Sequence, residues 1–313
     1  MNALTRDNPI QGIVLKLASI TSFTIMATSL KLASTLPVGQ LVFGRSFFSL
    51  IPLFAILAVR GDLRTGLQTA RFPAHFGRSV LGASAMAAGF TALTLLPLPE
   101  ATAIGFAGPL FVVVLSAVIL KEDVRVFRWS AVLVGFGGVL IMLWPRLTLL
   151  TDPGGLQAGE LIGAVAGLLS ALIGAFAGIT VRAMTKTERS ATIVIYFALF
   201  TSLFSLVSIP FGWVWPDPRE AALLVTAGIA GGFGQILLTE SYRHAELSTI
   251  APFDYTSLLY TLVVGYVLFG DLPTFAMLVG AAVVIAAGLA VIWRERLRGV
   301  DRTKMRKVSL PQN

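Results

Sequence analysis

The sequence predicts an all-α polytopic membrane protein, with ten transmembrane helices arranged as two inverted five-helix repeats. Three observations predict this fold. First, 56% of the 313 residues are hydrophobic and only 13% are charged, a balance too apolar for a soluble domain. Second, apolar segments of membrane-spanning length recur along the whole chain. Third, a pattern in the first half returns in the second half.

The apolar segments are separated by short connections that contain Gly, Pro and charged residues. No connection is long enough to hold a soluble domain. We therefore expect ten spans, numbered here in chain order: 10–35, 39–59, 77–97, 100–120, 127–144, 159–184, 191–212, 219–242, 246–269 and 274–294.

The internal repeat is clearest in spans four and nine. Each ends in an acidic residue, Glu122 or Asp271, which is followed by a turn and by another span that closes in Trp144 or Trp293. The two acids lie 149 positions apart, as do the two tryptophans. Five spans per repeat is an odd number, so the second copy must be inverted relative to the first. The expected boundaries are 1–150 and 151–298 for the repeats and 299–313 for a basic tail.

The basic residues orient the spans. Most of the 24 lysines and arginines fall in connections on one side of the predicted membrane and in the C-terminal tail. Lysine and arginine accumulate on the cytoplasmic side, so both termini are expected there. The basic tail either binds anionic lipid, worth about 1 kcal/mol per residue, or simply anchors the topology. The net charge of +8 is explained by the basic residues on this side of the membrane, so it does not indicate nucleic-acid binding.

Several functional classes have no support in the sequence. The chain has no cysteine, which excludes disulfides, thiolate metal sites and cysteine nucleophiles. Its two histidines lie in basic loop sequence and cannot form a metal cluster alone. No phosphate-binding loop is present, so ATP-driven transport within this chain is excluded. No motif of an intramembrane protease is present either, and we expect neither an enzyme nor a cofactor.

Asp254 is the strongest candidate functional residue. It lies inside span nine, where a carboxylate is costly and is rarely kept without a function. It must therefore face a water-filled cavity, pair with a cation such as Arg45, or be protonated. Pro252 precedes it and should kink or break the helix. Ser257 follows at helical spacing and is expected on the same face.

A second helix breaker lies in span four, at Gly108-Pro109, with Phe106 one turn before it. Paired breakers in corresponding spans of two repeats point to the binding site of a secondary transporter. Phe106, Tyr255 and Tyr260 either supply stacking surface there or serve only in packing.

Arg45 lies about 9 Å inside span two at helical rise. Its side chain either snorkels to the surface or is a buried cation that pairs with a carboxylate or with an anionic substrate group. Lys16 and Lys31 lie nearer the ends of span one, and we expect both to snorkel.

Further candidates are weaker. Gln235 in span eight forms either an interhelical hydrogen bond or a substrate contact. Met86 and Phe90 in span three either line a cavity or face lipid. Small residues at four-residue spacing favour close helix packing over substrate access; they are Gly159, Gly163, Gly167, Ala171 and Ala175, with further pairs at Gly174 and Gly178 and at Gly228 and Gly232.

The segments PLPEATAIGFAGPLFVVVLSAVILKEDV and ELSTIAPFDYTSLLYTLVVGYVLFGDLPT resemble the paired spans of EamA-type transporters in the drug/metabolite transporter superfamily. Arg45 matches a basic position common in that family. The resemblance covers nearly the whole chain. It implies a central cavity between the two repeats and export of small metabolites, such as aromatic and other amino acids, across a bacterial inner membrane. One departure is that Pro109 has no proline at the matching place in span nine, where Pro252 lies earlier.

We therefore expect an exporter of small metabolites, amino acids first, that works by alternating access. Arg45 and the broken-helix N-termini would take a carboxylate, and Asp254 an ammonium group. The alternatives are a passive channel or facilitator, or an exporter of another metabolite or a drug-like cation. The expected partners are the substrate and the bilayer, with no nucleic acid, and a monomer is compatible with the sequence. The residues expected to contact substrate are Arg45, Met86, Phe90, Phe106, Pro109, Gln235, Asp254, Tyr255, Ser257 and Tyr260.

Overall fold

The computed structural model describes residues 9–59, 61, 63–69, 71–119, 126–147, 158–184, 187–244 and 251–308. Within these ranges the chain is mostly helical, with short turns between helices, and forms no strand. Five helical stretches of the described residues are long and apolar enough to cross a membrane, one of which, Leu98–Leu115, continues from α5 into α6. The protein is therefore an all-α polytopic membrane protein, as the composition predicts.

The described residues form ten helical passes, of which the fourth and ninth are broken into shorter pieces. The first half contains α1 (Pro9–Leu32), α2 (Val38–Val59), the short α3 (Leu63–Gly66), α4 (Phe72–Leu95), α5 (Leu98–Gly105), α6 (Ala107–Val118) and α7 (Val126–Leu147). The second half contains α8 (Ala158–Met184), α9 (Ser190–Leu206), η2 (Ile209–Phe211), α10 (Pro218–His244), η3 (Ala251–Tyr255), α12 (Thr256–Val264), η4 (Gly265–Phe269) and α13 (Phe275–Val308).

Three helix ends differ most from the sequence prediction, and one of them is the end of α9 at Leu206, six residues before the predicted end at residue 212. Helix α4 begins at Phe72, five residues before the predicted start. Pro73 is tolerated in the first turn, where no backbone donor is needed, and the Phe72 ring packs against Tyr196 and Phe200 of α9. Helix α13 continues to Val308, past the predicted end of the span at residue 294. Its extension is charged rather than apolar, and Lys, Arg and Glu are good helix formers.

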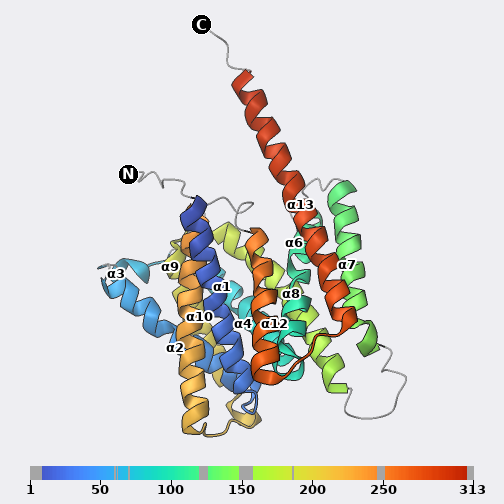
Figure 1. The fold of residues 1–313 in the computed structure, drawn as a ribbon. Helices are drawn as coiled ribbons and strands as arrows, with labels where there is room; N and C mark the ends of the chain where they lie inside the picture. The colour runs from blue at the N-terminus through green and yellow to red at the C-terminus, as the bar shows by residue number, and fades with distance from the viewer. Residues whose placement is uncertain are drawn as a thin grey trace.

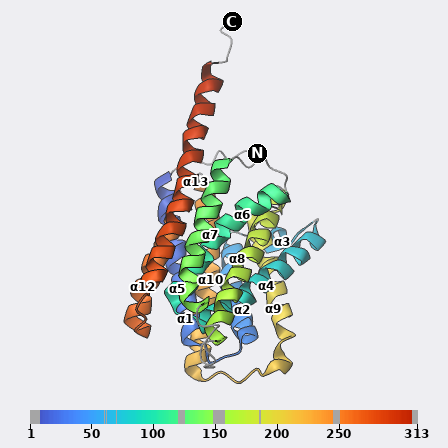
Figure 2. The ribbon, with the colours of Figure 1, turned by 90° about the vertical axis from the view of Figure 1, so that its right-hand side faces the viewer.

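The helices pack in a bundle with α7 and α13 side by side along one edge (Figures 1 and 2). Helix α1 packs against α10, α10 against α2, and α2 against α9, while α4 packs against both α8 and α9. The beginning of α1 and the end of α13 lie at the same end of the bundle (Figure 1). An even number of passes between them requires this.

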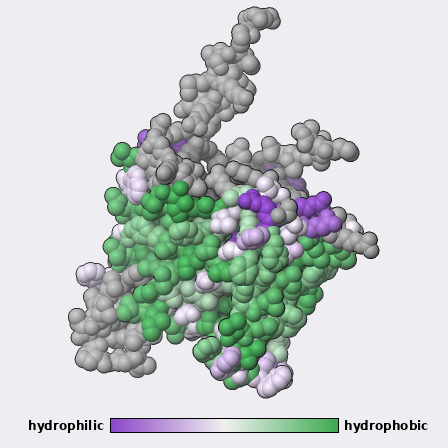
Figure 3. All heavy atoms as spheres, turned by 180° about the vertical axis from the view of Figure 1, so that it is seen from behind, coloured by the Kyte–Doolittle hydropathy of each residue, from purple (hydrophilic) through white to green (hydrophobic). Residues whose placement is uncertain are grey.

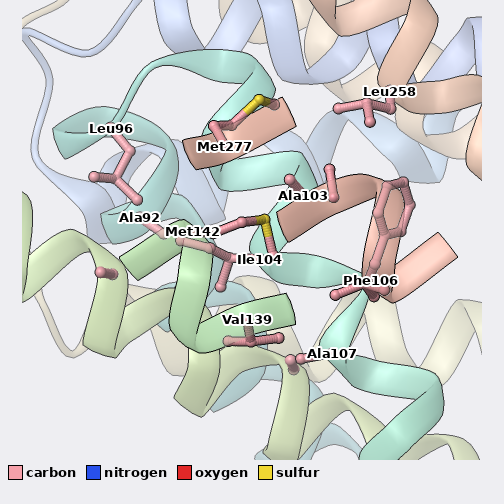
Figure 4. Close-up of a cluster of buried hydrophobic side chains, with 14 of the residues drawn as sticks. Ala92, Leu96, Ala103, Ile104, Phe106, Ala107, Val139, Met142, Leu258 and Met277 are labelled. Carbon is pink, nitrogen blue, oxygen red and sulfur yellow. The ribbon is translucent and has the colours of Figure 1, made fainter. Parts of the chain in front are cut away.

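The largest buried cluster joins the two halves of the chain. It contains Phe106 and Ala107 from the broken fourth pass, Leu258 from the ninth, and Met142 and Met277 from α7 and α13 (Figure 4). Segments far apart in the sequence therefore share one apolar core. This core packs against the broken segments of the fourth and ninth passes.

Glycines allow close packing at several helix contacts. A Cβ at Gly163 or Gly167 of α8 would lie 2.9 Å from Leu96 or Ile104 respectively. Gly228 and Gly232 of α10 lie against α2 in the same way. The packing interpretation of these four residues is therefore confirmed.

Gly174 and Gly178 differ from the other small residues of α8. A Cβ at either position would meet nothing within 4 Å. They therefore do not form the helix contact that their spacing predicts.

The outer surface is apolar over a broad area. Figure 3 shows hydrophobic side chains over much of one face, with hydrophilic residues gathered toward one end. Among the large exposed apolar side chains are Leu133, Val207 and Val263, which are more than half exposed. A water-facing protein would not expose such a continuous apolar face, so this surface suits contact with lipid.

Polar contacts join the two halves at opposite ends of α2. Beside its first residues, Thr35 donates to Glu220 (2.6 Å), and Gln40 exchanges two hydrogen bonds with the backbone of Val214. Beyond its last residues, Thr69 donates to Glu188 (3.0 Å), and Glu188 lies 3.6 Å from buried His75. The bundle is thus fastened by hydrogen bonds at both ends.

Candidate functional site

The fourth pass breaks at Phe106, between α5 and α6. Proline cannot donate a backbone hydrogen bond, so Pro109 leaves the carbonyl of Gly105, four residues earlier, without its helical partner. The Phe106 amide donates instead to Ala103 at 3.1 Å, a tighter turn than an α-helix makes. The break therefore lies one turn before the proline that causes it.

The ninth pass breaks at the corresponding depth. Residues 251–255 form a 3-10 helix, and a regular α-helix resumes only at Thr256. The Ser257 hydroxyl donates to the backbone carbonyl of Asp254 (2.7 Å) across the junction. The predicted disruption around Pro252 is therefore confirmed for the backbone.

The two breaks face each other across a pocket of about 430 Å³, a volume typical of small-molecule sites. The rings of Phe106 and Tyr255 meet edge to face, with centroids 5.1 Å apart. Gly288 of α13 leaves room for the Tyr255 hydroxyl, which a Cβ there would strike. The pocket is lined by Thr102, Gly105, Phe106, Pro109, Leu110, Val113, Val132, Asp254, Tyr255, Ser257 and Gly288.

Asp254 supplies the charge of this pocket. Its side chain is 51% exposed, and its Oδ1 lies 2.6 Å from the Nζ of Lys16, which is only 3% exposed. The expectation that Lys16 snorkels is therefore wrong. Its ammonium group is buried because Asp254 compensates its charge. Asp254 thus both pairs with a cation and faces a cavity, two of the three outcomes that its position in the span allows.

Arg45 is not the partner of Asp254. It is 6% exposed, so it does not snorkel, and its guanidinium lies over the Phe197 ring of α9, 5.8 Å from the centroid. Arg78 of α4 lies over the same ring, at 3.7 Å. Arg45 therefore belongs to a second charged region between α2, α4, α9 and α10.

Met86 and Phe90 lie near this second region. Met86 accepts a weak hydrogen bond from Ser46, the neighbour of Arg45, at 3.8 Å. Phe90 is buried in an apolar cluster against which Met86 packs. Arg78, Gly82, Met86 and Phe90 recur every four positions, so they share one face of α4.

Gln235 and Tyr260 are partly buried and are not among the residues that line the pocket. The ten predicted site residues therefore separate into groups. Five line the pocket at the helix breaks, three lie in or beside the arginine region, and Gln235 and Tyr260 are outside the pocket lining.

The pocket is equipped for binding. It offers one carboxylate, an aromatic edge-to-face pair, hydroxyl groups and apolar walls. A carboxylate can take an ammonium group, and the rings can take apolar or cationic surface.

Comparisons with known proteins identify the family and support the fold. The EamA-like transporter family model matches residues 10–144 and again residues 161–294. A solved crystal structure superposes with a TM-score of 0.64, covering 91% of this chain and 98% of that one. Its sequence identity is 20%, so this likeness concerns the fold alone.

The curated relatives are transporters and not enzymes. The S-adenosylmethionine uptake transporter of Rickettsia prowazekii is 29% identical over 280 residues, covering 90% of this chain and 91% of the relative. The pseudopaline exporter CntI of Pseudomonas aeruginosa is 27% identical over 286 residues, covering 90% and 95%. A riboflavin transporter of Rhizobium johnstonii is 29% identical over 225 residues, covering 72% and 71%. With both halves matched by the family model, the chain belongs to the EamA-like transporter family of small-molecule transporters.

Proposed function

We propose that this protein exports amino acids or closely related amines across the bacterial inner membrane, and that the pocket between the two broken helices binds the substrate ammonium. The observation that carries this proposal is Asp254: its carboxylate lies on the pocket and already holds one ammonium group, that of Lys16.

The ion pair leaves Asp254 able to bind a second cation. A carboxylate has two oxygens and about four acceptor positions, and Lys16 contacts Oδ1. Half of the side chain remains exposed. A substrate ammonium can therefore bind beside Lys16 or displace it, while Phe106 and Tyr255 contact its apolar part and Ser257 lies at the pocket edge.

The relatives support the substrate class more than the direction. S-adenosylmethionine, the cargo named for one relative, is itself an amino-acid derivative with an ammonium group. The named relatives include both an uptake transporter and an exporter. We propose export because the whole chain resembles EamA-type exporters of small metabolites. The direction of transport is tested in the same liposome experiment as the substrate.

Alternating access is proposed on the inverted repeats and on the hydrogen bonds at the two ends of the bundle. Each set joins segments of opposite halves, so opening one end requires breaking only the contacts of that end. Inverted repeats build two such gates around one site near the midplane.

The orientation can be tested separately. Gln68 and Trp215 are exposed and lie in connections predicted on opposite sides. Since the chain has no cysteine, Gln68→Cys should react with an impermeant thiol reagent only from inside, and Trp215→Cys only from outside. Labelling of both from outside would contradict cytoplasmic termini joined by ten spans.

The substrate proposal is tested with purified protein in liposomes, using labelled amino acids and analogues that lack the ammonium group. Wild type should show saturable flux and trans-stimulation, whereas a passive channel shows neither. Asp254→Asn should weaken amino-acid transport about ten- to hundredfold, since a charge-assisted hydrogen bond is worth roughly 1.5–3 kcal/mol. Analogues without the ammonium should be spared.

Two controls accompany this variant. Asp217→Asn replaces an exposed acid that accepts a hydrogen bond from the Glu220 amide, which asparagine can also accept, and should leave transport unchanged. Lys16→Met/Asp254→Asn removes both charges, so it should fold like wild type and still transport poorly. Normal saturable uptake of amino acids by Asp254→Asn would refute the role of Asp254 in amine binding.

A further inference from the structure

Buried Arg45 and partly buried Arg78 lie against one aromatic ring, and no acid of the described residues pairs with either. The guanidinium carbons of Arg45 and Arg78 lie 5.8 Å and 3.7 Å from the centroid of the Phe197 ring. Among the residues that the structure describes, neither arginine has a carboxylate partner. Arg45 Nε, and both Nε and Nη1 of Arg78, are buried with no hydrogen-bond acceptor.

Such an arrangement is unfavourable by itself. Two like charges repel in a low-dielectric interior, and the buried N–H groups of both arginines have lost their contact with water. The Phe197 ring offsets part of this cost through cation–π attraction, but one ring supplies no hydrogen-bond acceptors. The unpaired N–H donors therefore call for an acceptor that is negatively charged.

The surroundings are shaped for the guanidinium groups. A Cβ at Gly82 would collide with Arg78 Nη1 and with the Phe197 ring, and a Cβ at Gly231 would lie 3.2 Å from Arg45 Nε. The hydroxyl of Thr201, one turn beyond Phe197 on α9, is also buried without a partner. The two glycines thus give the guanidinium groups their places beside Phe197, and unsatisfied polar atoms gather around that ring.

We propose that Arg45 and Arg78 form an oxyanion-binding site that receives the carboxylate of the transported metabolite. The planar guanidinium presents paired N–H donors that match the two oxygens of a carboxylate, and phosphate shares this geometry. The anion site is inferred only from the unpaired N–H donors. Its assignment to the substrate rests on the proposed function.

This site is separate from the Asp254 pocket. Met26 of α1 and Arg45 both lie against Gly231, whereas Lys16 of α1 pairs with Asp254. Ten residues of helix separate Met26 from Lys16, which is about 15 Å. The ammonium and carboxylate of an α-amino acid are attached to one carbon, so such a molecule contacts one site at a time. In this conformation a substrate would therefore occupy the two sites one after the other.

The test measures anion binding by the purified full-length protein in lipid nanodiscs. Its thermal unfolding is followed against sodium succinate, sodium phosphate and, at equal ionic strength, sodium chloride. In wild type, succinate should raise the Tm in a saturable way that chloride does not reproduce. Arg45→Gln and Arg78→Gln should each weaken this binding about ten- to hundredfold.

The variants have matched controls. Arg294→Gln removes an exposed arginine that also lies over a ring, 4.1 Å from the Phe127 centroid, and should bind succinate like wild type. Arg45→Lys keeps the charge but loses the paired donors, so it should bind with intermediate affinity even if the glutamine variants do not fold. Without anion, Arg78→Gln should be at least as stable as wild type, because one of two repelling charges is gone.

The outcomes separate this site from the proposed function. Undiminished succinate binding in Asp254→Asn supports an anion site that is independent of the Asp254 pocket. Succinate binding should persist even if the protein transports no amino acid. Phosphate binding tighter than succinate overturns the carboxylate assignment. An equal Tm response to succinate and chloride in wild type, or an unchanged succinate response in the arginine variants, overturns the site.

Discussion

The Asp254 pocket and the Arg45–Arg78 site hold charges inside the same membrane bundle in opposite ways. At Asp254 the charges are balanced by Lys16, and the carboxylate remains half exposed. At the arginine site buried Arg45 and partly buried Arg78 lie against Phe197, and the part of the chain that the structure describes supplies no acid to pair with them. The first region is complete without ligand, whereas the second is not. A balanced pair can exchange partners at little cost, whereas an unbalanced pair gains stability only when an anion arrives.

The largest expected effect comes from breaking the balance at Asp254. Asp254→Ala leaves the Lys16 ammonium buried without its carboxylate, and breaking a buried ion pair from one side costs about 3–5 kcal/mol. We expect the lower end, because Asp254 is half exposed. Thermal or denaturant unfolding in detergent measures the loss.

The double variant Lys16→Met/Asp254→Ala is the matched comparison. It removes both charges, so it should recover most of the lost stability. If the single variant is as stable as wild type, the ion pair does not hold α1 to the ninth pass, and the contrast between the two regions fails.

A smaller effect is expected from filling the space beside Arg78. Gly82→Ala places a methyl group against Arg78 Nη1 and the Phe197 ring, and overpacking of this kind costs about 1–3 kcal/mol. It should also weaken succinate binding, since the guanidinium must move. Unfolding and anion titration measure the two effects.

Gly77→Ala serves as the control on the same helix. A Cβ at position 77 meets nothing within 4 Å, so alanine should stabilise α4 by about 1 kcal/mol through its better helix propensity. Equal behaviour of Gly82→Ala and Gly77→Ala would show that Gly82 is not needed to seat Arg78.

The smallest effect on stability is expected at the helix break beside the pocket. Pro109→Ala restores an amide that can donate to the Gly105 carbonyl, a hydrogen bond worth about 1 kcal/mol. The fourth pass should then straighten and move Phe106 relative to Tyr255. We expect slightly higher stability with lower amino-acid flux in liposomes. Unchanged flux would show that the break does not shape the site.

The sequence predicts where the pocket lies because the helix breaks that form it depend on nearby prolines in the same helix. A proline removes one backbone donor wherever the helix lies, so the breaks near Pro109 and Pro252 could be located without a structure. Asp254, Tyr255 and Ser257 follow from the second break, and Phe106 from the first. These five residues require no knowledge of neighbouring helices.

The partners of the charged residues depend on packing and could not be predicted in this way. Helical spacing tells which face Lys16 occupies but not that η3 lies against it. Arg78 is the second residue of the predicted span 77–97, a position from which a long side chain is expected to reach the membrane surface. Since α4 begins at Phe72, Arg78 lies in its second turn and turns into the bundle. A glycine four residues later was the one sequence signal of this placement.

The double hydrogen bond between Gln40 and the Val214 backbone has a kinetic consequence. The Val214 amide donates to the Gln40 side chain rather than to a helix carbonyl, so its protection depends on the two halves staying in contact. Its rate of hydrogen–deuterium exchange therefore reports how often this end of the bundle separates. Exchange at this single amide can thus be measured without any substrate, as a test of the proposed opening at this end of the bundle.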